Sequence, residues 1–189
     1  MSEAGTMTSG EQVAERKARM PGRRVQVYHP NPKGSGAALQ LELRLNVRQG
    51  ERYDCFFLDM APQKTCAVLA KNDARPATFD WENKVTVKLG FADICEMVAV
   101  LEGRGDQAGS SRGGIYHQNG GTSTVIRLEK YRTGGFLLGL SRKSADMDTP
   151  VRVATVLSES EALGIRHVLS VGLCMMSLPR SSDHTWMGE

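Results

Sequence analysis

Hydrophobic and polar residues alternate strictly over residues 39–48, where every second residue is Leu or Val. This period of two predicts a strand that buries one face and turns its polar groups outward. Apolar runs of similar kind predict further strands at residues 25–28, 53–61, 64–71 and 79–89. We expect a turn at residues 48–51 and another at Pro62-Gln63.

The period changes to three and four in residues 90–103, where Phe91, Ile94, Val98 and Leu101 share one side. This spacing predicts an amphipathic helix, and Gly103 ends it. Residues 103–114 are rich in glycine and serine. We therefore expect a flexible loop between two halves of the chain.

The second half repeats the order of strands followed by a helix. Gly120-Gly121 and Gly134-Gly135 are hairpin signals. The apolar runs around them predict strands at residues 115–119, 122–131, 136–143 and 151–157. Ser158 and Glu161 have the spacing of a capping box, which predicts a helix start. The helix continues to about Met176, and Pro179 ends it.

Each half thus contains about four strands and a helix, in halves 25–103 and 113–179. This order predicts an α+β protein with two antiparallel four-stranded sheets, each followed by a helix that packs on one face. The other face of each sheet then meets water, a partner or a ligand. Residues 1–24 are polar and end in a basic cluster, and residues 180–189 are polar, so we expect flexible tails on both sides of the domain 25–179.

Composition narrows the function only slightly. The formal net charge is +3 and the pI is about 8.7, which permits a nucleic-acid partner without requiring one. No apolar run is long enough to span a membrane, and residues 1–20 lack the apolar core of a secretory signal.

The four cysteines are scattered, and each lies in an apolar run. We interpret Cys55, Cys66, Cys95 and Cys174 as small core residues of an intracellular protein in a reducing compartment, such as the cytoplasm or nucleoid. Neither the cysteines nor the four histidines cluster as zinc ligands do. The sequence therefore predicts neither a metal site nor another cofactor.

The stretch Lys33-Gly34-Ser35-Gly36 invites comparison with loops that hold nucleotide phosphates. A phosphate-binding P-loop places its lysine after the glycines and continues into a helix. Here the lysine precedes the glycines, and a strand follows. A dinucleotide-binding fingerprint fails for the same reason. The stretch is better explained as the entry to a sheet.

Residues 32–39 resemble the Lys-Gly-Lys-Ala-Ala-Leu stretch of the plant Whirly proteins, which bind single-stranded DNA. The chain keeps Lys33, Gly34, Ala37, Ala38 and Leu39, but has one extra residue and lacks the second lysine. Residues 55–63 are similar to the strand of that family that ends in Phe-Ala-Pro. Residues 79–103 are similar to its Tyr-Asp-Trp strand and following helix. The resemblance covers residues 25–179.

The resemblance implies two roughly perpendicular four-stranded sheets with two helices behind them, in a homotetramer held by those helices. Single strands would lie across the exposed sheet faces. Kinetoplastid mitochondrial guide-RNA-binding proteins share this fold, so the resemblance leaves DNA or RNA open as the ligand.

Binding of single strands without sequence readout uses cations for phosphates and flat side chains for bases. Residues of both kinds lie on the predicted strands and loops. The candidates are Lys33, Arg44, Arg48, Lys64, Trp81, Lys84, Lys88, Lys130, Tyr131, Arg132, Arg142 and Lys143.

No acid–base or nucleophile motif is present, so we expect no enzymatic activity. The leading hypothesis is binding of single-stranded nucleic acid, with DNA preferred. One alternative is RNA binding or annealing of the guide-RNA-binding type. Another is a protein-interaction scaffold, because residues 162–179 form a helix that is apolar on most sides and rich in methionine, as an oligomer interface would be.

Overall fold

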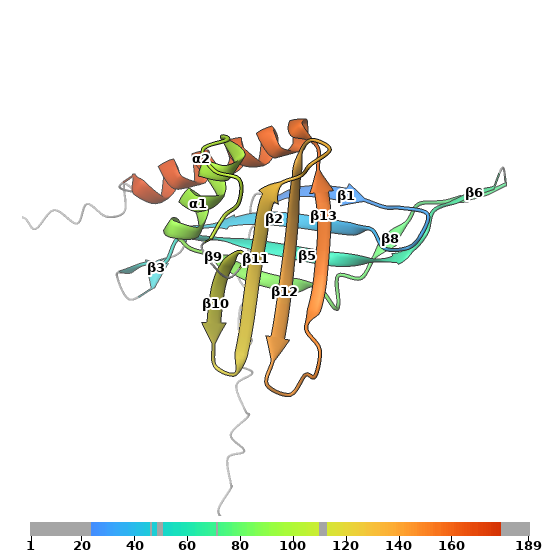
Figure 1. The fold of residues 1–189 in the computed structure, drawn as a ribbon, viewed down its shortest axis with the longest axis horizontal. Helices are drawn as coiled ribbons and strands as arrows, with labels where there is room; N and C mark the ends of the chain where they lie inside the picture. The colour runs from blue at the N-terminus through green and yellow to red at the C-terminus, as the bar shows by residue number, and fades with distance from the viewer. Residues whose placement is uncertain (1–23, 46, 49–50, 71, 110–112, 179–189) are drawn as a thin grey trace, which may run out of the picture.

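The computed structural model describes residues 24–45, 47–48, 51–70, 72–109 and 113–178, with only the main chain at 47–48 and 51–52. Both predicted tails lie outside these residues, apart from Arg24 at the end of the first. The described chain is an α+β structure with antiparallel sheets and two helices, as the sequence predicts (Figure 1). The predicted arrangement of two equal halves, each with four strands followed by a helix, agrees only loosely with the structure.

The first sheet is built around one long central strand. Its strands are β1 (Arg24–His29), β2 (Ala37–Arg44), β5 (Cys55–Thr65), β8 (Thr78–Phe79) and β9 (Val85–Leu89). β1 pairs with β2 and β2 with β5, while β9 and β8 follow one another along the other edge of β5. Two small hairpins, β3 (Val47–Arg48) with β4 (Glu51–Arg52) and β6 (Val68–Ala70) with β7 (Asp73–Arg75), lie outside this sheet.

The predicted turn at Pro62-Gln63 is wrong, because β5 runs straight through Pro62. The Pro62 carbonyl accepts a hydrogen bond from Asp80 N, whereas Gln63 N donates to Gly36 O toward β2. The missing N–H of Pro62 therefore falls on the edge between the end of β8 at Phe79 and the start of β9 at Val85, where no ladder bond is lost. The strand predicted at 64–71 is also wrong: its end forms β6, which projects from the body (Figure 1).

The run 79–89 is interrupted instead of being one strand. Asp80 accepts hydrogen bonds from Asn83 N and Nδ2 at 3.3 and 2.8 Å, which closes a turn between β8 and β9. The hydrogen bond from the Asn83 side chain also holds the pKa of Asp80 below its usual value. Turn chemistry therefore overrides the apolar pattern here.

The second sheet follows the prediction closely. It is a meander of β10 (Ile115–Asn119), β11 (Thr122–Lys130), β12 (Phe136–Ser144) and β13 (Val151–Leu157) in chain order. Residues 106–108, predicted as part of a flexible loop, are instead bonded to the edge of β11: Ala108 N donates to Leu128 O and Lys130 N to Asp106 O, each at 2.8 Å.

Helix α1 (Phe91–Leu101) and helix α2 (Glu159–Ser177) lie together at one end of the sheets (Figure 1). The predicted capping box at the start of α2 is confirmed. Glu161 N donates to Ser158 Oγ at 3.3 Å, and Ser158 N donates to a Glu161 carboxylate oxygen at 2.8 Å. Both reciprocal bonds satisfy main-chain groups that the helix start leaves open.

One apolar core serves both sheets and both helices. The strands of the second sheet cross those of the first in Figure 1, and inner-face residues of both sheets belong to one buried cluster, among them Leu39, Leu58, Ile126 and Leu140. The interpretation of the cysteines as core residues is correct only for Cys55. Cys66, Cys95 and Cys174 are exposed thiols, because each lies on the outer side of its element or in a loop.

Two histidine–carboxylate pairs tie each sheet to the helix of the other half. His29 Nε2, at the end of β1, lies 3.1 Å from Glu161 Oε1 in α2. His117 Nε2, on β10, lies 3.0 Å from Asp93 Oδ1 in α1. Both carboxylates are at the third position of their helix, where they also bond to the helix start. The two halves are thus joined by equivalent contacts.

The contact between α2 and β5 gives the first prediction. A Cβ on Gly172 would clash with the Phe56 ring, whereas a Cβ on Gly164 in the same helix would meet nothing within 4 Å. We expect Gly172→Ala to destabilise the protein by about 1–3 kcal/mol through overpacking. Gly164→Ala should stabilise it by up to about 1 kcal/mol. Urea unfolding measures both, and a Gly172→Ala protein at least as stable as wild type would contradict this packing.

Glu161 gives a prediction about pH. Its burial by itself raises the carboxyl pKa, but the bonds from Ser158 and the neighbouring His29 outweigh this effect and leave the pKa below its usual 4.5. A depressed pKa means that ionised Glu161 stabilises the fold above that value, and that this contribution is lost as pH falls through the folded pKa. Glu161→Gln keeps the capping bonds without the charge. The difference in stability between wild type and variant should therefore shrink as the pH falls below 4.5. Thermal unfolding at a series of pH values measures this, and a difference that does not change below pH 4.5 would contradict it.

Candidate nucleic-acid interface

The first sheet turns a hydrogen-bonded row of polar side chains away from the core. Gln26 on β1 donates to Gln40 on β2 at 2.8 Å, and Gln40 donates to Asp59 on β5 at 3.3 Å. Lys84 and the Thr86 hydroxyl donate to the two Asp59 oxygens at 2.7 and 2.6 Å. Asp59 is only 4% exposed, so Lys84 neutralises a buried carboxylate.

A second row on this face holds a further buried carboxylate. The Glu42 side chain accepts from Arg24 Nε at 3.2 Å and from Arg44 Nε at 2.9 Å. The Arg44 guanidinium carbon lies 4.6 Å from the centre of the Phe57 ring, a cation–π contact. Lys88 is opposite Phe57 in the register and exposed, with no acidic partner among the described residues. Lys88 is therefore the candidate cation of this face that is still available to an anion.

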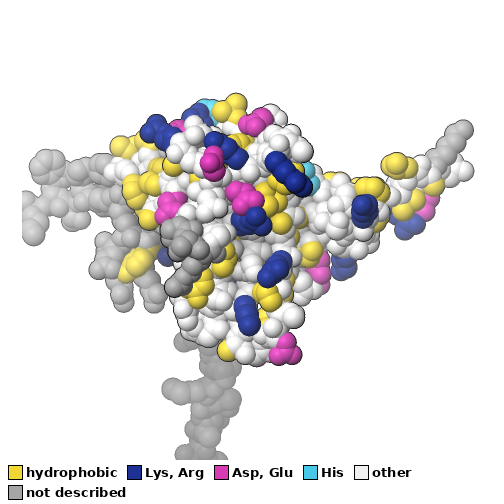
Figure 2. All heavy atoms as spheres, in the orientation of Figure 1, with side chains coloured by type: hydrophobic (Ala, Val, Ile, Leu, Met, Phe, Trp, Pro, Cys, Tyr) yellow, Lys and Arg dark blue, Asp and Glu magenta, His cyan; other side chains and the backbone are white. Residues whose placement is uncertain are grey.

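The second sheet presents its outer face toward the viewer in Figure 2, where Lys and Arg side chains lie among apolar ones. Two rows cross β11, β12 and β13 on this face, one through Arg127, Gly139 and Ala154 and the other through Val125, Ser141 and Arg152. Because Gly139 has no side chain, a shallow groove of about 340 Å³ lies between the two arginines. The groove has apolar walls and cationic ends, as a base and its phosphates require.

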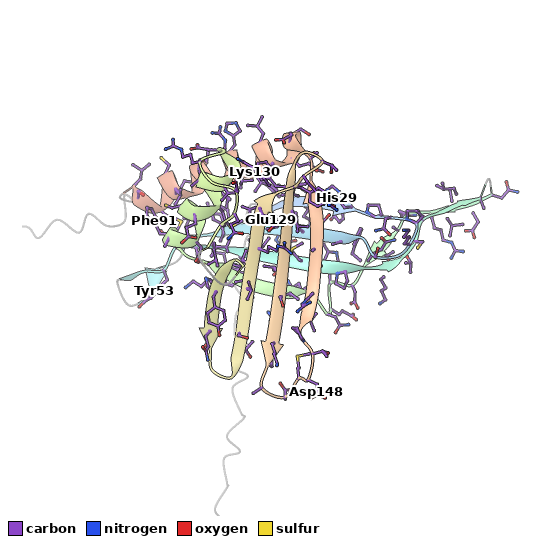
Figure 3. The ribbon with its side chains drawn as sticks, viewed as in Figure 1. His29, Tyr53, Phe91, Glu129, Lys130 and Asp148 are labelled. Carbon is purple, nitrogen blue, oxygen red and sulfur yellow. The ribbon has the colours of Figure 1, made fainter. Side chains whose placement is uncertain are left out.

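The two arginines of this groove differ in their partners. Arg127 donates from Nε and Nη2 to the two oxygens of Glu129, at 2.8 and 2.7 Å, and Figure 3 shows Glu129 on this same face. Arg152 is exposed, as is Lys143 on β12, and neither has an acidic partner in the described part of the chain. Tyr116, on the neighbouring β10, is 38% exposed and adds an aromatic ring to the face.

The loop that contains Lys33 is fixed to the first sheet. The Asn31 side-chain oxygen accepts from Lys33 N at 3.0 Å and Ser35 N at 3.1 Å. Gln63 Oε1 accepts from Asn31 N at 2.8 Å and from Gly36 N at 3.1 Å. Gly34 has φ 72°, a left-handed conformation that favours glycine. The loop therefore presents the exposed Lys33 side chain from a held backbone, and it encloses no phosphate cradle.

The remaining candidates are spread over the molecule. Lys130 is the last residue of β11, at the helix end of the second sheet (Figure 3), and is paired with Asp106 at 3.0 Å. Tyr131 and Arg132 lie in the turn that follows. Lys64 is exposed near the far end of β5, and Trp81 is half-buried in the turn after β8.

The structure thus brings some candidates together and separates others. Arg44, Lys84 and Lys88 share the outer face of the first sheet, while Lys88 and Arg142 line one cleft between the sheets. Lys143 lies on the outer face of the second sheet. The Arg48 side chain lies outside the described residues.

The candidates named from the sequence lack five residues that the structure places on the two faces: Arg24, Phe57, Tyr116, Arg127 and Arg152. A signal for Arg152 and Tyr116 existed, since both alternate with buried residues in the strands VRVATVL and IYHQN. What the alternation could not provide is the strand order, which places Tyr116 and Arg152 on one face of the same sheet.

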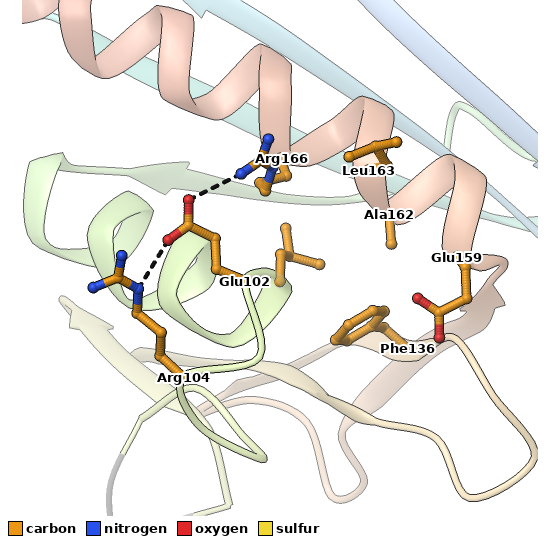
Figure 4. Close-up of a pocket in the computed structure, with 8 residues that line it drawn as sticks. Glu102, Arg104, Phe136, Glu159, Ala162, Leu163 and Arg166 are labelled. Atoms are coloured by element: carbon orange, nitrogen blue, oxygen red, sulfur yellow. Dashed lines mark hydrogen bonds and ion pairs between the residues drawn. The ribbon is translucent and has the colours of Figure 1, made fainter.

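A separate cleft of about 660 Å³ lies where α1, α2 and β12 meet (Figure 4). Glu102 accepts from Arg104 and Arg166 at 3.0 Å each, and Glu159 Oε1 accepts from Gly135 N at 2.9 Å. These bonds join the end of α1 to α2, and α2 to the turn before β12, so we interpret the cleft as a junction between elements, in which Arg166 Nε is buried without a hydrogen-bond partner among the described residues. In the part of the chain that the structure describes, no group of three or more His, Cys, Asp or Glu could hold a metal ion. Nor is any helix there long and apolar enough to cross a membrane.

Comparison with solved structures identifies the fold. WHY3 from Arabidopsis thaliana is 18% identical at a TM-score of 0.56, over 78% of this chain and 86% of that one. The plant transcriptional regulator PBF-2 is 16% identical at a TM-score of 0.60, over 82% and 89%. The resemblance to the Whirly proteins is therefore confirmed at the level of the fold.

The guide-RNA-binding relatives match as well. The Trypanosoma MRP1/MRP2 proteins are 14% identical at a TM-score of 0.53, over 82% of this chain and 94% of theirs. A guide-RNA-binding protein complex bound to a guide RNA is 18% identical at 0.51, over 85% and 94%. No protein-family model and no curated protein matches the sequence.

The two lysines of the first sheet give a testable contrast. Lys84→Met removes the cation from buried Asp59, and we expect a loss of about 1.5–3 kcal/mol of stability, the usual cost for a hydrogen bond to a charged group. Lys88→Met removes an exposed lysine without an acidic partner among the described residues, and should change stability by less than about 0.5 kcal/mol. Urea unfolding of the two variants measures the difference, and equal losses would show that Lys84 has no structural role.

Proposed function

We propose that this protein binds single-stranded nucleic acid, preferably DNA and with little sequence preference, and that it is not an enzyme. The observation that carries the proposal is that each sheet has an outer face on which cations stand beside apolar or aromatic side chains. Lys88 lies opposite Phe57 on one face, and Arg152 lines the groove with Val125 and Leu137 on the other. Phosphates would pair with the cations while bases contact the flat surface.

The structural relatives support the proposal. All of the matched structures named above have a TM-score above 0.5, and one of them is a complex of guide-RNA-binding proteins with a guide RNA bound. RNA is therefore the second candidate ligand, favoured by the guide-RNA-binding relatives.

We propose further that copies of the chain associate through α2, as a homotetramer in a reducing compartment. Three exposed apolar residues support this contact: Leu163 at 52%, Val171 at 58% and Leu178 at 55% exposure. Val171 also lines an apolar pocket of about 320 Å³ between α2 and the strands β1, β2 and β5. The same surface supports the alternative of a protein-interaction scaffold without nucleic acid.

Fluorescence anisotropy with labelled single-stranded DNA, the same sequence as RNA and the duplex, each at several salt concentrations, tests the function. We expect both single strands to bind more tightly than the duplex, with affinity that falls as salt rises. Lys33→Glu with Lys88→Glu should weaken binding about tenfold or more and lower the slope of log K against log salt by about 1.4, two phosphate contacts on a single strand.

Arg75→Glu with Arg104→Glu is the matched control. It makes the same change in net charge, on the β6–β7 hairpin and after α1, away from both sheet faces. The control should keep most of the affinity. If both double variants weaken binding equally, the loss is due to the change in net charge and not to the two lysines. If wild type binds none of the nucleic acids at low salt, the proposed function is wrong and the protein-interaction scaffold becomes the better hypothesis.

A further inference from the structure

The inner face of the second sheet changes character along its length. Near the helices it is apolar, and the row through Ile115, Ile126, Leu140 and Val153 is buried. Toward the free end, the next row on the same face holds His117, Thr124 and Arg142, and the row after it holds Asn119, Thr122 and Ser144. A face turned toward another sheet gains nothing for packing from six polar residues, so these rows call for a different explanation.

These rows line a cleft of about 390 Å³ that is closed on its other side by Thr86, Val87 and Lys88 of the first sheet. Lys88 and Arg142 contribute two positive charges. Arg142 Nη2 donates to Thr86 O at 2.6 Å, which holds the guanidinium between the sheets. His117 is already paired with Asp93, and Asp59, next to Thr86, with Lys84. The cleft therefore has a net positive charge.

Thr124 is the least expected member of this group. It is only 8% exposed and lines the cleft, and no hydrogen bond of its hydroxyl to another described residue is present. Because this oxygen is not among the fully buried, unpartnered polar atoms, it faces the open space of the cleft, where it can bond to water or to an anion. Its position in the register between His117 and Arg142 places it at the centre of the polar row.

We infer that this cleft is a phosphate-binding site, which holds a phosphate group of the nucleic-acid strand between the two sheets. The inference rests on the proposed function. Arginine, lysine, hydroxyl and amide groups are the ones that proteins direct at phosphate oxygens, and the cleft contains all four kinds. Lys88 also belongs to the outer face of the first sheet. A nucleic-acid strand bound on that face could therefore place one of its phosphates in the cleft while its neighbouring nucleotides stay on the sheet.

Two arms of one experiment test the site on the full chain. In the first, inorganic phosphate is titrated into ¹⁵N-labelled protein and amide shifts are followed by NMR. Shifts concentrated at residues 86–88, 122–124 and 142–144 support the site, and shifts that are absent or spread over all exposed lysines overturn it. In the second, anisotropy with labelled single-stranded DNA gives the affinity and its salt slope for each variant.

The decisive variant is Thr124→Val, with Thr155→Val as its matched control. Thr155 is equally buried at 9% and faces the same way on β13, but does not line the cleft. We expect Thr124→Val to fold at least as stably as wild type and to bind the strand about tenfold more weakly, the loss of one hydrogen bond to a charged group. Its salt slope should not change. Thr155→Val should bind as wild type does.

Arg142→Gln should weaken binding and lower the salt slope by about 0.7, because one phosphate contact on a single strand is lost. Wild-type affinity in both folded cleft variants, with salt-dependent binding intact, would overturn the cleft and leave the proposed function standing. If wild type binds no strand at all, the proposed function fails, and the phosphate titration alone then decides whether the cleft takes an anion.

Discussion

A β-sheet has only two faces, and one face of each sheet is buried in the shared apolar core. Leu39 and Leu41 of β2 face the same apolar cluster as Ile126 and Leu128 of β11. Period-two geometry then leaves Gln40, Glu42, Arg127 and their neighbours on the opposite faces. The molecule therefore has two outward sheet surfaces whose positions are set by burial elsewhere. The position of the candidate interface is therefore a consequence of how the core is assembled.

The cations on these surfaces fall into two kinds. Lys84, Arg24 and Arg44 neutralise the carboxylates of Asp59 and Glu42, which lie in the sheet with little exposure. The second kind pairs with no carboxylate among the described residues, and comprises Lys88, Lys143 and Arg152. Removing one partner of a buried salt bridge leaves an unpaired buried charge and strongly destabilises a protein. The first kind of cation therefore stabilises the sheet. The second kind is free to exchange water and salt ions for a ligand.

Sequence pattern predicted the second sheet and both helices because their signals are local. Glycine pairs at Gly120-Gly121 and Gly134-Gly135 determine the hairpins, and Ser158 with Glu161 determines the start of α2. It failed where a distant partner decides the outcome. Pro62 stays inside β5 because its nitrogen meets the gap between β9 and β8. The candidate site was predicted less well than the fold. The pairing of Lys84 with Asp59 and the cleft around Thr124 both depend on which strands become neighbours, and the sequence pattern does not show this.

The reciprocal histidine–carboxylate contacts also bear on how the chain folds. His29 and Glu161 are 132 positions apart, and α2 packs through Gly172 on Phe56 of the first sheet. During synthesis, the first sheet therefore lacks its covering helix until the chain has been made as far as α2, more than a hundred residues after Phe56. Such long-range closure slows folding and leaves an apolar sheet face open to premature association. The duplicated outline does not make two independent folding units, and a chain cut at the central loop would leave each sheet without the helix it needs.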